Sequence, residues 1–290
     1  MIIWGAYAPL LQGIIMADLT KIHDLNESIV LDLDGPSIET LGRDYLGYSQ
    51  LGAECLRMLW YSFRWCQIVS HTGRMQRIFD RGFHEEVVIA KNLEHAGAIL
   101  FDDQIELVGP TGHLKGHIDG KIKWEKYFDD VVLFENKTAD KAGFTKFKKK
   151  GLESAFPGYY SQVNSYMKHT GLELAIEIVT CKDSEERHIE IVEYNQDVAV
   201  TADLKGIKVV TSDEPFPRIG DSTWWQCKLC DYRLVCHHNE PIPRTCRTCV
   251  DGVVADDGIW KCQLHDKLLS SDDQKKACPD YQILDSLIDD

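Results

Sequence analysis

Two carboxylates and a lysine occur close together in the segment 116–139, GHIDGKIKWEKYFDDVVLFENKTA. Asp119 lies in a stretch of alternating character, and Glu135 and Lys137 follow an apolar run. Side chains two apart on a strand share a face, so Glu135 and Lys137 project together, and an adjacent strand can bring Asp119 beside them. Two converging carboxylates repel each other unless a cation joins them, and Mg²⁺ prefers such oxygen ligands. The pattern is typical of a metal site where Lys137 orients or deprotonates a water for phosphodiester hydrolysis.

Each of these residues also has an ordinary structural explanation. Asp119 precedes a glycine, and an Asp-Gly pair favours a turn. Glu135 and Lys137 could be charges on an edge strand that discourage pairing with another sheet. If the metal interpretation holds, the backbone carbonyl of Asn136 is a natural additional ligand.

Asp119, Glu135 and Lys137 resemble the D…ExK core of the PD-(D/E)XK nuclease superfamily. A further motif is similar to its RecB-type branch, which includes the iron–sulfur nucleases of recombination and CRISPR adaptation. There a Q-x-x-x-Y motif follows the core, and Gln162-Val-Asn-Ser-Tyr166 matches it on one helical face. The resemblance implies that Asp119 and Glu135 hold Mg²⁺ or Mn²⁺ and that Lys137 positions the water. It implies that Gln162 and Tyr166 orient the scissile strand or the lysine.

The same resemblance implies a third metal ligand on a helix that precedes the core. In the RecB-type branch this ligand is a histidine, and the run 81–86, RGFHEE, supplies His84. Glu85 or Glu86 is the alternative, because some viral exonucleases of the superfamily use an acid on this helix. The resemblance rests on the order of all these motifs over roughly 80 residues rather than on any single residue.

Cysteines are unusually frequent, with ten in 290 residues, and seven of them follow residue 226. A secreted disulfide scaffold would be shorter and more evenly studded, so we interpret them as metal ligands in a reducing compartment. Cys227, Cys230 and Cys236, in C-x2-C-x5-C spacing, are too close for independent disulfides. A zinc site completed by His237 or His238 is one interpretation.

The nuclease resemblance gives another interpretation of this cluster. In the iron–sulfur members, three C-terminal cysteines of this spacing join one cysteine upstream of the core, and the segment 49–61, SQLGAECLRMLWY, resembles the upstream one. Cys66 is an alternative fourth ligand, but the residues around it do not resemble that upstream segment. Four thiolates suit a 4Fe–4S cluster, or zinc, in a structural role. The implied ligands are Cys55, Cys227, Cys230 and Cys236.

Four further cysteines near the C-terminus have the spacing of a Cys₄ zinc ribbon. His265 could replace the last of them. This ribbon departs from the RecB-type pattern and suggests an extension that binds substrate or a partner. Cys181 is expected to be a buried strand cysteine. The predicted zinc ligands are Cys246, Cys249, Cys262 and Cys278.

The elements that must position these residues follow the order helix, helix, strand meander, helix, two strands. This order predicts an α/β fold with a central mixed β-sheet flanked by helices, which the resemblance makes restriction-endonuclease-like, plus a small cysteine-rich module. The second helix should have Ile78, Phe79, Val87, Val88 and Leu93 as its apolar side. Helices are predicted at 50–65, 74–95, 158–169 and 197–208, and strands at 99–108, 114–124, 131–137, 175–181 and 188–194. The expected domains are an N-terminal extension, 1–40, a nuclease core, 41–214, and a cysteine-rich metal-binding region, 215–290.

The net charge of −14 means that any DNA-binding surface must be a local basic patch. A lysine tract closely following the catalytic strand could track the DNA backbone, or it could be a solvated face. Nearby Phe144, Phe147 and Phe156 could stack on unpaired bases, but packing on the sheet is the simpler expectation. No motif for reading base edges is visible, so sequence specificity is not expected. The candidate DNA-binding lysines are Lys146, Lys148, Lys149 and Lys150.

We therefore predict a metal-dependent DNA exonuclease of recombination, repair or replication, acting on single strands or DNA ends in a bacterial or phage-infected cytoplasm. Recombination or replication proteins would be its partners. The alternatives are an inactive zinc- or iron–sulfur-stabilised DNA-binding module and an iron–sulfur redox protein. No membrane association is expected, because the apolar stretch Met1–Met16 lacks basic residues and is too short to span a bilayer. Met16 is an alternative start.

Overall fold

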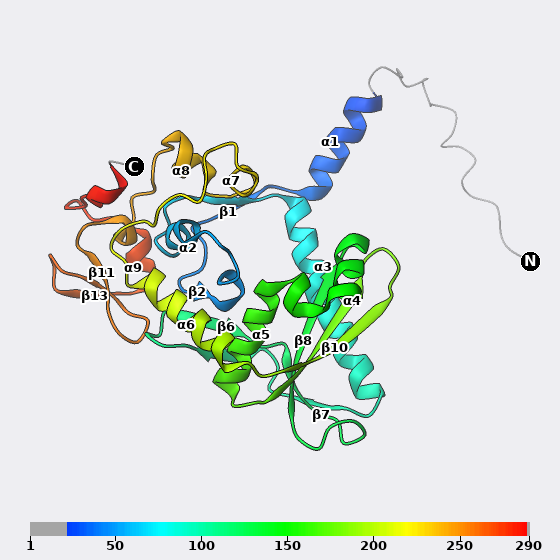
Figure 1. Ribbon diagram of the computed structural model, residues 1–290. Coiled ribbons are helices and arrows are strands. Elements are labelled where there is room, and N and C mark those ends of the chain that lie inside the picture. The colour runs from blue at the N-terminus through cyan, green and yellow to red at the C-terminus, as the bar shows by residue number, and fades with distance from the viewer. Residues whose placement is uncertain (1–21, 289–290) are drawn as a thin grey trace, which may run out of the picture.

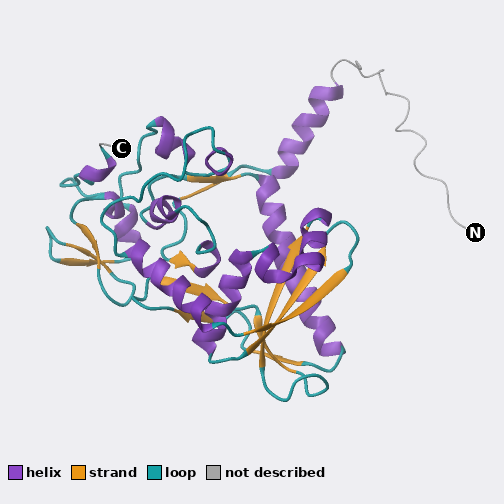
Figure 2. Ribbon diagram, viewed as in Figure 1, coloured by secondary structure: helices purple, strands orange, loops and turns teal. Residues whose placement is uncertain are grey.

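The computed structural model describes residues 22–288, so the apolar stretch 1–16 lies outside the described residues. A five-stranded sheet in the order β10-β9-β8-β7-β4 carries the candidate site. Strands β8 and β9 are parallel and the other neighbouring pairs are antiparallel, which confirms the predicted mixed sheet (Figure 2). The strands are β4 (Ile99–Phe101), β7 (Gly120–Lys123), β8 (Val132–Ala139), β9 (Leu174–Cys181) and β10 (Arg187–Glu193).

Helices cover both faces of this sheet. Helix α3 (Gly73–His95) packs on one face, where Ile89 and Leu93 belong to a buried cluster with Phe134. Helices α4 (Lys141–Ala155) and α5 (Pro157–Thr170) pack on the other. Phe144 and Phe147 of α4 are buried in the main core, as expected for rings that pack on the sheet. Helices α3 and α5 are therefore present as predicted, whereas α4 is a helix that the sequence analysis did not predict.

The buried side of α3 differs from the one expected from the sequence. Ile78, Phe79 and Val87 are 46%, 42% and 52% exposed, whereas Glu85, Ile89 and Leu93 are buried. Residues four apart lie on one helical face, so the face that packs on the sheet is centred on Ile89. The apolar side chains nearer the start of the helix point instead toward a cleft described below.

Two predicted strands are each divided between two sheets. The segment 114–124 forms β6 (Leu114–His117) and β7, and the segment 99–108 forms β4 and β5 (Glu106–Val108). Strands β5 and β6 belong to a smaller sheet with β2 (Leu46–Gly47). The residues between β4 and β5 turn sharply, with positive φ at Asp102 and Gln104. Consequently Asp119 lies where the chain passes from the small sheet to the central one.

Two of the other helices before the cysteine-rich segment differ from the sequence prediction. The helix predicted at 50–65 begins only at residue 56, after a 3-10 turn, η2 (Tyr48–Gln50), as α2 (Leu56–Phe63). A further helix, α1 (Ile22–Asp34), projects from the body (Figure 1), and β1 (Ile38–Thr40) pairs with β3 (Val69–His71). Helix α6 (Gln196–Val210) packs on α5 and α2.

The cysteine-rich segment shares its core with the rest of the protein. Trp260, Leu269 and Leu287 belong to the same buried cluster as Leu59 and Leu114. Figure 1 shows this segment folded against α2. Its elements are α7 (Trp225–Lys228), α8 (Arg233–His238), η3 (Cys246–Thr248), β11 (Gly252–Val254), β12 (Trp260–Cys262), β13 (Lys267–Leu269), α9 (Ser271–Lys275) and η4 (Asp285–Leu287). No helix between residues 22 and 288 has the length and apolar character needed to cross a membrane.

Candidate active site

Hydrogen bonds link Asp119, Glu135 and Lys137 at the edge between β7 and β8. The antiparallel pairing of Gly120 with Phe134 places Asp119 beside Glu135. The Asp119 amide donates to Glu135 Oε1 at 3.3 Å, and Asp119 Oδ2 accepts from the Asn136 amide at 2.7 Å. Lys137 Nζ donates to Glu135 Oε2 at 2.9 Å and to the Asn136 carbonyl at 3.2 Å. The two predicted acids and the lysine thus form one connected unit.

This unit is buried and contains more acidic than basic groups. Glu135 is 1% exposed, and its burial, followed by the negative charge of Asp119, raises its pKa well above the usual value. Burial alone would lower the pKa of Lys137, but Glu135 and Asp119 raise it well above its usual value, so the ammonium keeps its proton. Two carboxylates share one ammonium group. A divalent cation would offset the excess negative charge, and the oxygen donors present suit Mg²⁺ or Mn²⁺.

A cleft of about 870 Å³ opens beside this unit. Asp119, Asn136 and Lys137 line its sheet side, while Glu135 lies buried behind them. Lys137 Nζ lies 5.6 Å from the centroid of the Tyr159 ring, which also lines the cleft. Sequence reasoning missed Tyr159, although it is three residues before Gln162 on the same helix. The other charged or aromatic lining residues are Arg43, His71, Phe79, Asp80, Phe83, Glu86, Lys182, Asp231 and Tyr232.

The two alternatives for a third ligand on α3 differ in position. His84 is exposed and is not among the residues that line the cleft, whereas Glu86 lines it. Burial and then the charge of Asp119 raise the pKa of Glu86, and its Oε1 accepts from Gln104 Nε2 at 2.6 Å. Glu85 is buried, 3.8 Å from Arg187. Glu86 is therefore the acid of this helix that lies near Asp119.

Gln162 and Tyr166 lie behind the unit rather than in the open cleft. Both are buried on α5, and Gln162 Nε2 donates to Tyr166 Oη at 3.0 Å. Burial and then the charge of Glu135 raise the pKa of Tyr166. Gly116 makes room for the ring, because a Cβ there would lie 2.4 Å from Tyr166 Cε1. These two side chains can hold Glu135 in place from behind.

Glu177 is a further buried acid that sequence reasoning missed. It is paired in register with Glu135 across β8 and β9 and is 1% exposed. Burial raises its pKa to about 7, against the nearby positive charge of Lys137. The available signal was a single acid inside an otherwise apolar strand, LAIEIVTC.

The predicted DNA-binding lysine tract lies away from the cleft. Its four lysines are exposed on α4, and none is among the residues that line the cleft. Lys146 Nζ donates to the Ala155 carbonyl at 2.7 Å and lies 5.3 Å from the centroid of the Phe156 ring. Lys148 lies 5.6 Å from the centroid of the Phe144 ring. The cleft obtains its lining cations from Arg43, Lys137 and Lys182 instead.

The first predicted cysteine set surrounds one small cavity. Cys66, the alternative fourth cysteine, is fully buried and does not line this cavity. Of the two histidines that could complete a zinc site, His237 lines the cavity. Burial, with smaller contributions from the neighbouring Cys55 and Cys236, raises the pKa of the Cys230 thiol to about 11. The cavity, of about 20 Å³, is lined by Cys55, Cys227, Cys230 and Cys236. These four soft ligands suit iron–sulfur or zinc binding.

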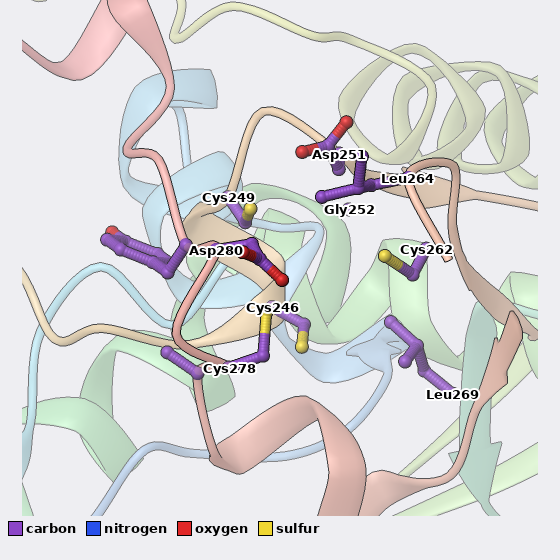
Figure 3. A pocket seen from close by; sticks show the side chains of 11 residues that line it. Cys246, Cys249, Asp251, Gly252, Cys262, Leu264, Leu269, Cys278 and Asp280 are labelled. Carbon is purple, nitrogen blue, oxygen red and sulfur yellow. The ribbon is translucent and has the colours of Figure 1, made fainter. Parts of the chain in front are cut away.

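The second predicted set also surrounds a cavity of about 20 Å³. Figure 3 shows the side chains of Cys246, Cys249, Cys262 and Cys278 around a common space. Cys278 Sγ lies 3.7 Å from His265 Nε2, which is 3.4 Å from Asp280 Oδ2. The ligand atoms of His265, Cys278 and Asp280 all lie within 4.8 Å of one another. Cys278 therefore lines the cavity with the other three cysteines, and His265 lies beside Cys278.

Comparisons with known proteins give remote similarity only. No protein-family model matches the sequence, and no curated protein matches it. Among solved structures, the chain is similar to SSO0001, with 16% identity over 75% of this chain and 96% of that one, at a TM-score of 0.42. It is also similar to an alkaline exonuclease, LHK-Exo, from Laribacter hongkongensis, with 15% identity over 57% of this chain and 86% of that one, at a TM-score of 0.42. The same exonuclease in complex with dAMP has 14% identity over the same shares, at a TM-score of 0.42.

Proposed function

We propose that this protein is a metal-dependent deoxyribonuclease that acts as an exonuclease in DNA recombination, repair or replication. The observation that carries the proposal is the hydrogen-bonded unit of Asp119, Glu135 and Lys137 on the wall of a cleft of about 870 Å³. Two carboxylates and a lysine beside an open cleft suit hydrolysis of a phosphodiester by an activated water.

Asp119 and Glu135 would hold Mg²⁺ or Mn²⁺, with the Asn136 carbonyl as a further oxygen ligand. For the third metal-ligating side chain we favour Glu86 over His84, because Glu86 lines the cleft and the charge of Asp119 contributes to its raised pKa. The bound metal would supply Lewis-acid activation of the phosphate and of the attacking water.

Lys137 would position the water as a hydrogen-bond donor. Its raised pKa keeps the ammonium protonated, so it donates and neutralises charge rather than acting as the base. Gln162 and Tyr166 would restrain Glu135 from behind. The exposed ring of Phe83 and the partly exposed ring of Tyr159 face the cleft, where they can stack on unpaired bases without regard to sequence. Arg43 and Lys182 are placed to contact phosphates.

The cysteine sites would support this cleft. We propose a 4Fe–4S cluster or zinc at the Cys55, Cys227, Cys230 and Cys236 set, and zinc at the Cys246 set. Asp231 and Tyr232, which directly follow Cys230, line the cleft. A metal on these thiolates would therefore fix one cleft wall. Thiolate ligands of this kind persist in a reducing compartment such as a bacterial or phage-infected cytoplasm.

The test is digestion of 5′- and 3′-labelled single- and double-stranded DNA by anaerobically purified protein, with Mg²⁺, Mn²⁺ or EDTA. We expect metal-dependent shortening that falls at least about 100-fold in Glu135→Ala and Lys137→Met. Lys121→Met is the matched control, because Lys121 is on the adjacent strand and pairs with Asp102 instead. The position of the surviving label gives the polarity of digestion. No cleavage with any metal, in protein whose cysteine sites are loaded, would contradict the proposal.

A further inference from the structure

Three glutamates stand side by side on one face of the central sheet. The strand register pairs Glu135 with Glu177 across β8 and β9, and Glu177 with Glu190 across β9 and β10. Directly paired residues project to the same side of a sheet, and neighbouring strands are about 4.8 Å apart. The row therefore runs away from the candidate site beneath α4 and α5, the helices that cover this face.

The two outer glutamates have hydrogen-bond donors on the described part of the chain. Glu135 accepts from the Asp119 amide and from Lys137, and Glu190 Oε2 accepts from the Leu152 amide at 2.8 Å. Glu177 lies between them, 1% exposed, and its Oε1 has no hydrogen-bond partner among residues 22–288. A buried carboxylate oxygen without a donor destabilises the folded protein. A strand position with only a packing role would favour an apolar residue.

Lys137 is the cation that this row faces. The charged groups that interact with Glu177 include Asp119, Glu135 and Glu190, which are acids, and the cation Lys137. An ammonium group has three N–H donors. In the structure one donates to Glu135 Oε2 and one to the Asn136 carbonyl, which leaves one for a water in the cleft. If Glu135 Oε2 takes another partner, the lysine needs a second anionic acceptor to keep that arrangement.

We propose that Glu177 is a positioning residue for Lys137, a second carboxylate that holds the ammonium group at the cleft wall when Glu135 engages another partner. Glu177 does not touch substrate, because it is buried behind the cleft lining. This inference rests on the proposed nuclease function for its catalytic consequence, but the coupling between the two side chains exists independently of that function.

The coupling is measured first, without any activity assay, by a double-mutant cycle in urea unfolding. The variants are Lys137→Met, Glu177→Gln and the double variant. We expect non-additive effects, equivalent to at least a tenfold change in the unfolding equilibrium constant. Glu190→Gln is the matched control, because it removes the same charge one strand further on. It should combine additively with Lys137→Met, within about twofold. Additive behaviour of the Glu177 and Lys137 variants would overturn the proposal.

The cleavage assay then tests the consequence. Glu177→Gln should lower kcat at least tenfold with KM within twofold, and should have no further effect in the Lys137→Met background. Glu190→Gln should cleave like the unmodified protein. Glu177→Met also removes the charge with little change in volume and should behave like Glu177→Gln. It replaces Glu177→Gln in the assay if that variant folds poorly. Equal losses in both backgrounds would show that Glu177 does not act through Lys137. Absence of cleavage in the unmodified protein would refute the nuclease, whereas the unfolding cycle would still decide the coupling.

Discussion

The guanidinium carbon of Arg247 lies 3.7 Å from the centroid of the Trp65 ring. Arg247 belongs to the cysteine-rich segment, yet it is fully buried and donates to the carbonyls of Phe63 and Asp44 at 2.7 and 2.8 Å. Its Nε donates to Gln274 Oε1 at 2.8 Å. One side chain thus connects η3 to the N-terminal part of the core and to α9, so the two regions should unfold together.

Arg247→Met should lower the free energy of unfolding by about 3 kcal/mol or more, because it leaves two buried carbonyls and an amide without their charged donor. Urea denaturation followed by fluorescence and by circular dichroism measures this. Arg244→Met is the control, since the exposed Arg244 lies 4.9 Å from the Tyr281 ring and should contribute less than about 1 kcal/mol. Separate transitions for the two regions in the unmodified protein would contradict the single cooperative unit.

Gly116→Ala should displace the Tyr166 ring and reduce cleavage. The added Cβ would lie 2.4 Å from Tyr166 Cε1 and 2.7 Å from its Oη, and the buried ring has little room to move. We expect a loss of about 1–3 kcal/mol in stability, as for other overpacked cores. Thermal unfolding and the cleavage rate measure the two effects. Gly82→Ala, where no heavy atom lies within 4 Å of the new Cβ, should instead leave stability unchanged or raise it by up to about 1 kcal/mol.

Asp203 should make the protein acid-sensitive between about pH 4 and pH 2. Burial would raise its pKa, but hydrogen bonds from His169, Lys168 and Tyr48 hold it at about 2. This folded-state value lies below the unfolded value of about 3.9. The stabilisation is therefore complete above pH about 5 and is lost as the pH falls toward 2, by about 1–2 kcal/mol after allowance for solvent screening. Unfolding free energies measured across this range should show a flatter profile in Asp203→Asn. An unchanged profile would exclude this role.

Cysteine variants should separate the two proposed metal sites. Cys230→Ser should lose the metal of the Cys55 set, and Cys262→Ser that of the Cys246 set, as counted by metal analysis of the purified protein. Cys66→Ala should keep both metals, because Cys66 lies outside both cavities. Cys230→Ser should also reduce cleavage, since Asp231 and Tyr232 line the cleft. Metal loss in Cys66→Ala but not in Cys55→Ala would reverse the assignment of the fourth ligand.

Glu86→Gln should raise the Mg²⁺ concentration needed for half-maximal cleavage by about tenfold or more, as expected when a group near a metal loses its charge. His84→Gln should change it by less than about twofold, because His84 is exposed outside the cleft. The two substitutions sit two residues apart on one helix, so each controls for the other. The opposite ranking would restore the histidine as the ligand.

The parts of the site that depend on local periodicity could be predicted from the sequence. Glu135 and Lys137 share a face because strand side chains alternate, and the paired β7 and β8 bring Asp119 beside them. The α5 helix was predictable within a residue, and its four-residue spacing aligns Gln162 with Tyr166. A two-residue gap likewise keeps Cys227 with Cys230, and Cys246 with Cys249, beside the same cavity.

Packing between distant segments selects the other residues that join the site. The register of parallel β8 and β9 sets Glu177 beside Glu135, and that register depends on packing between segments about 40 residues apart. The rotation of α3 about its axis, set by Ile89 and Leu93 against the sheet, turns Glu86 toward the cleft and leaves His84 outside. Helix α4 carries the lysine tract away from the cleft because Phe144 and Phe147 are buried in the core beneath it. Local sequence specifies the period of an element, whereas burial against other elements selects the face that it presents.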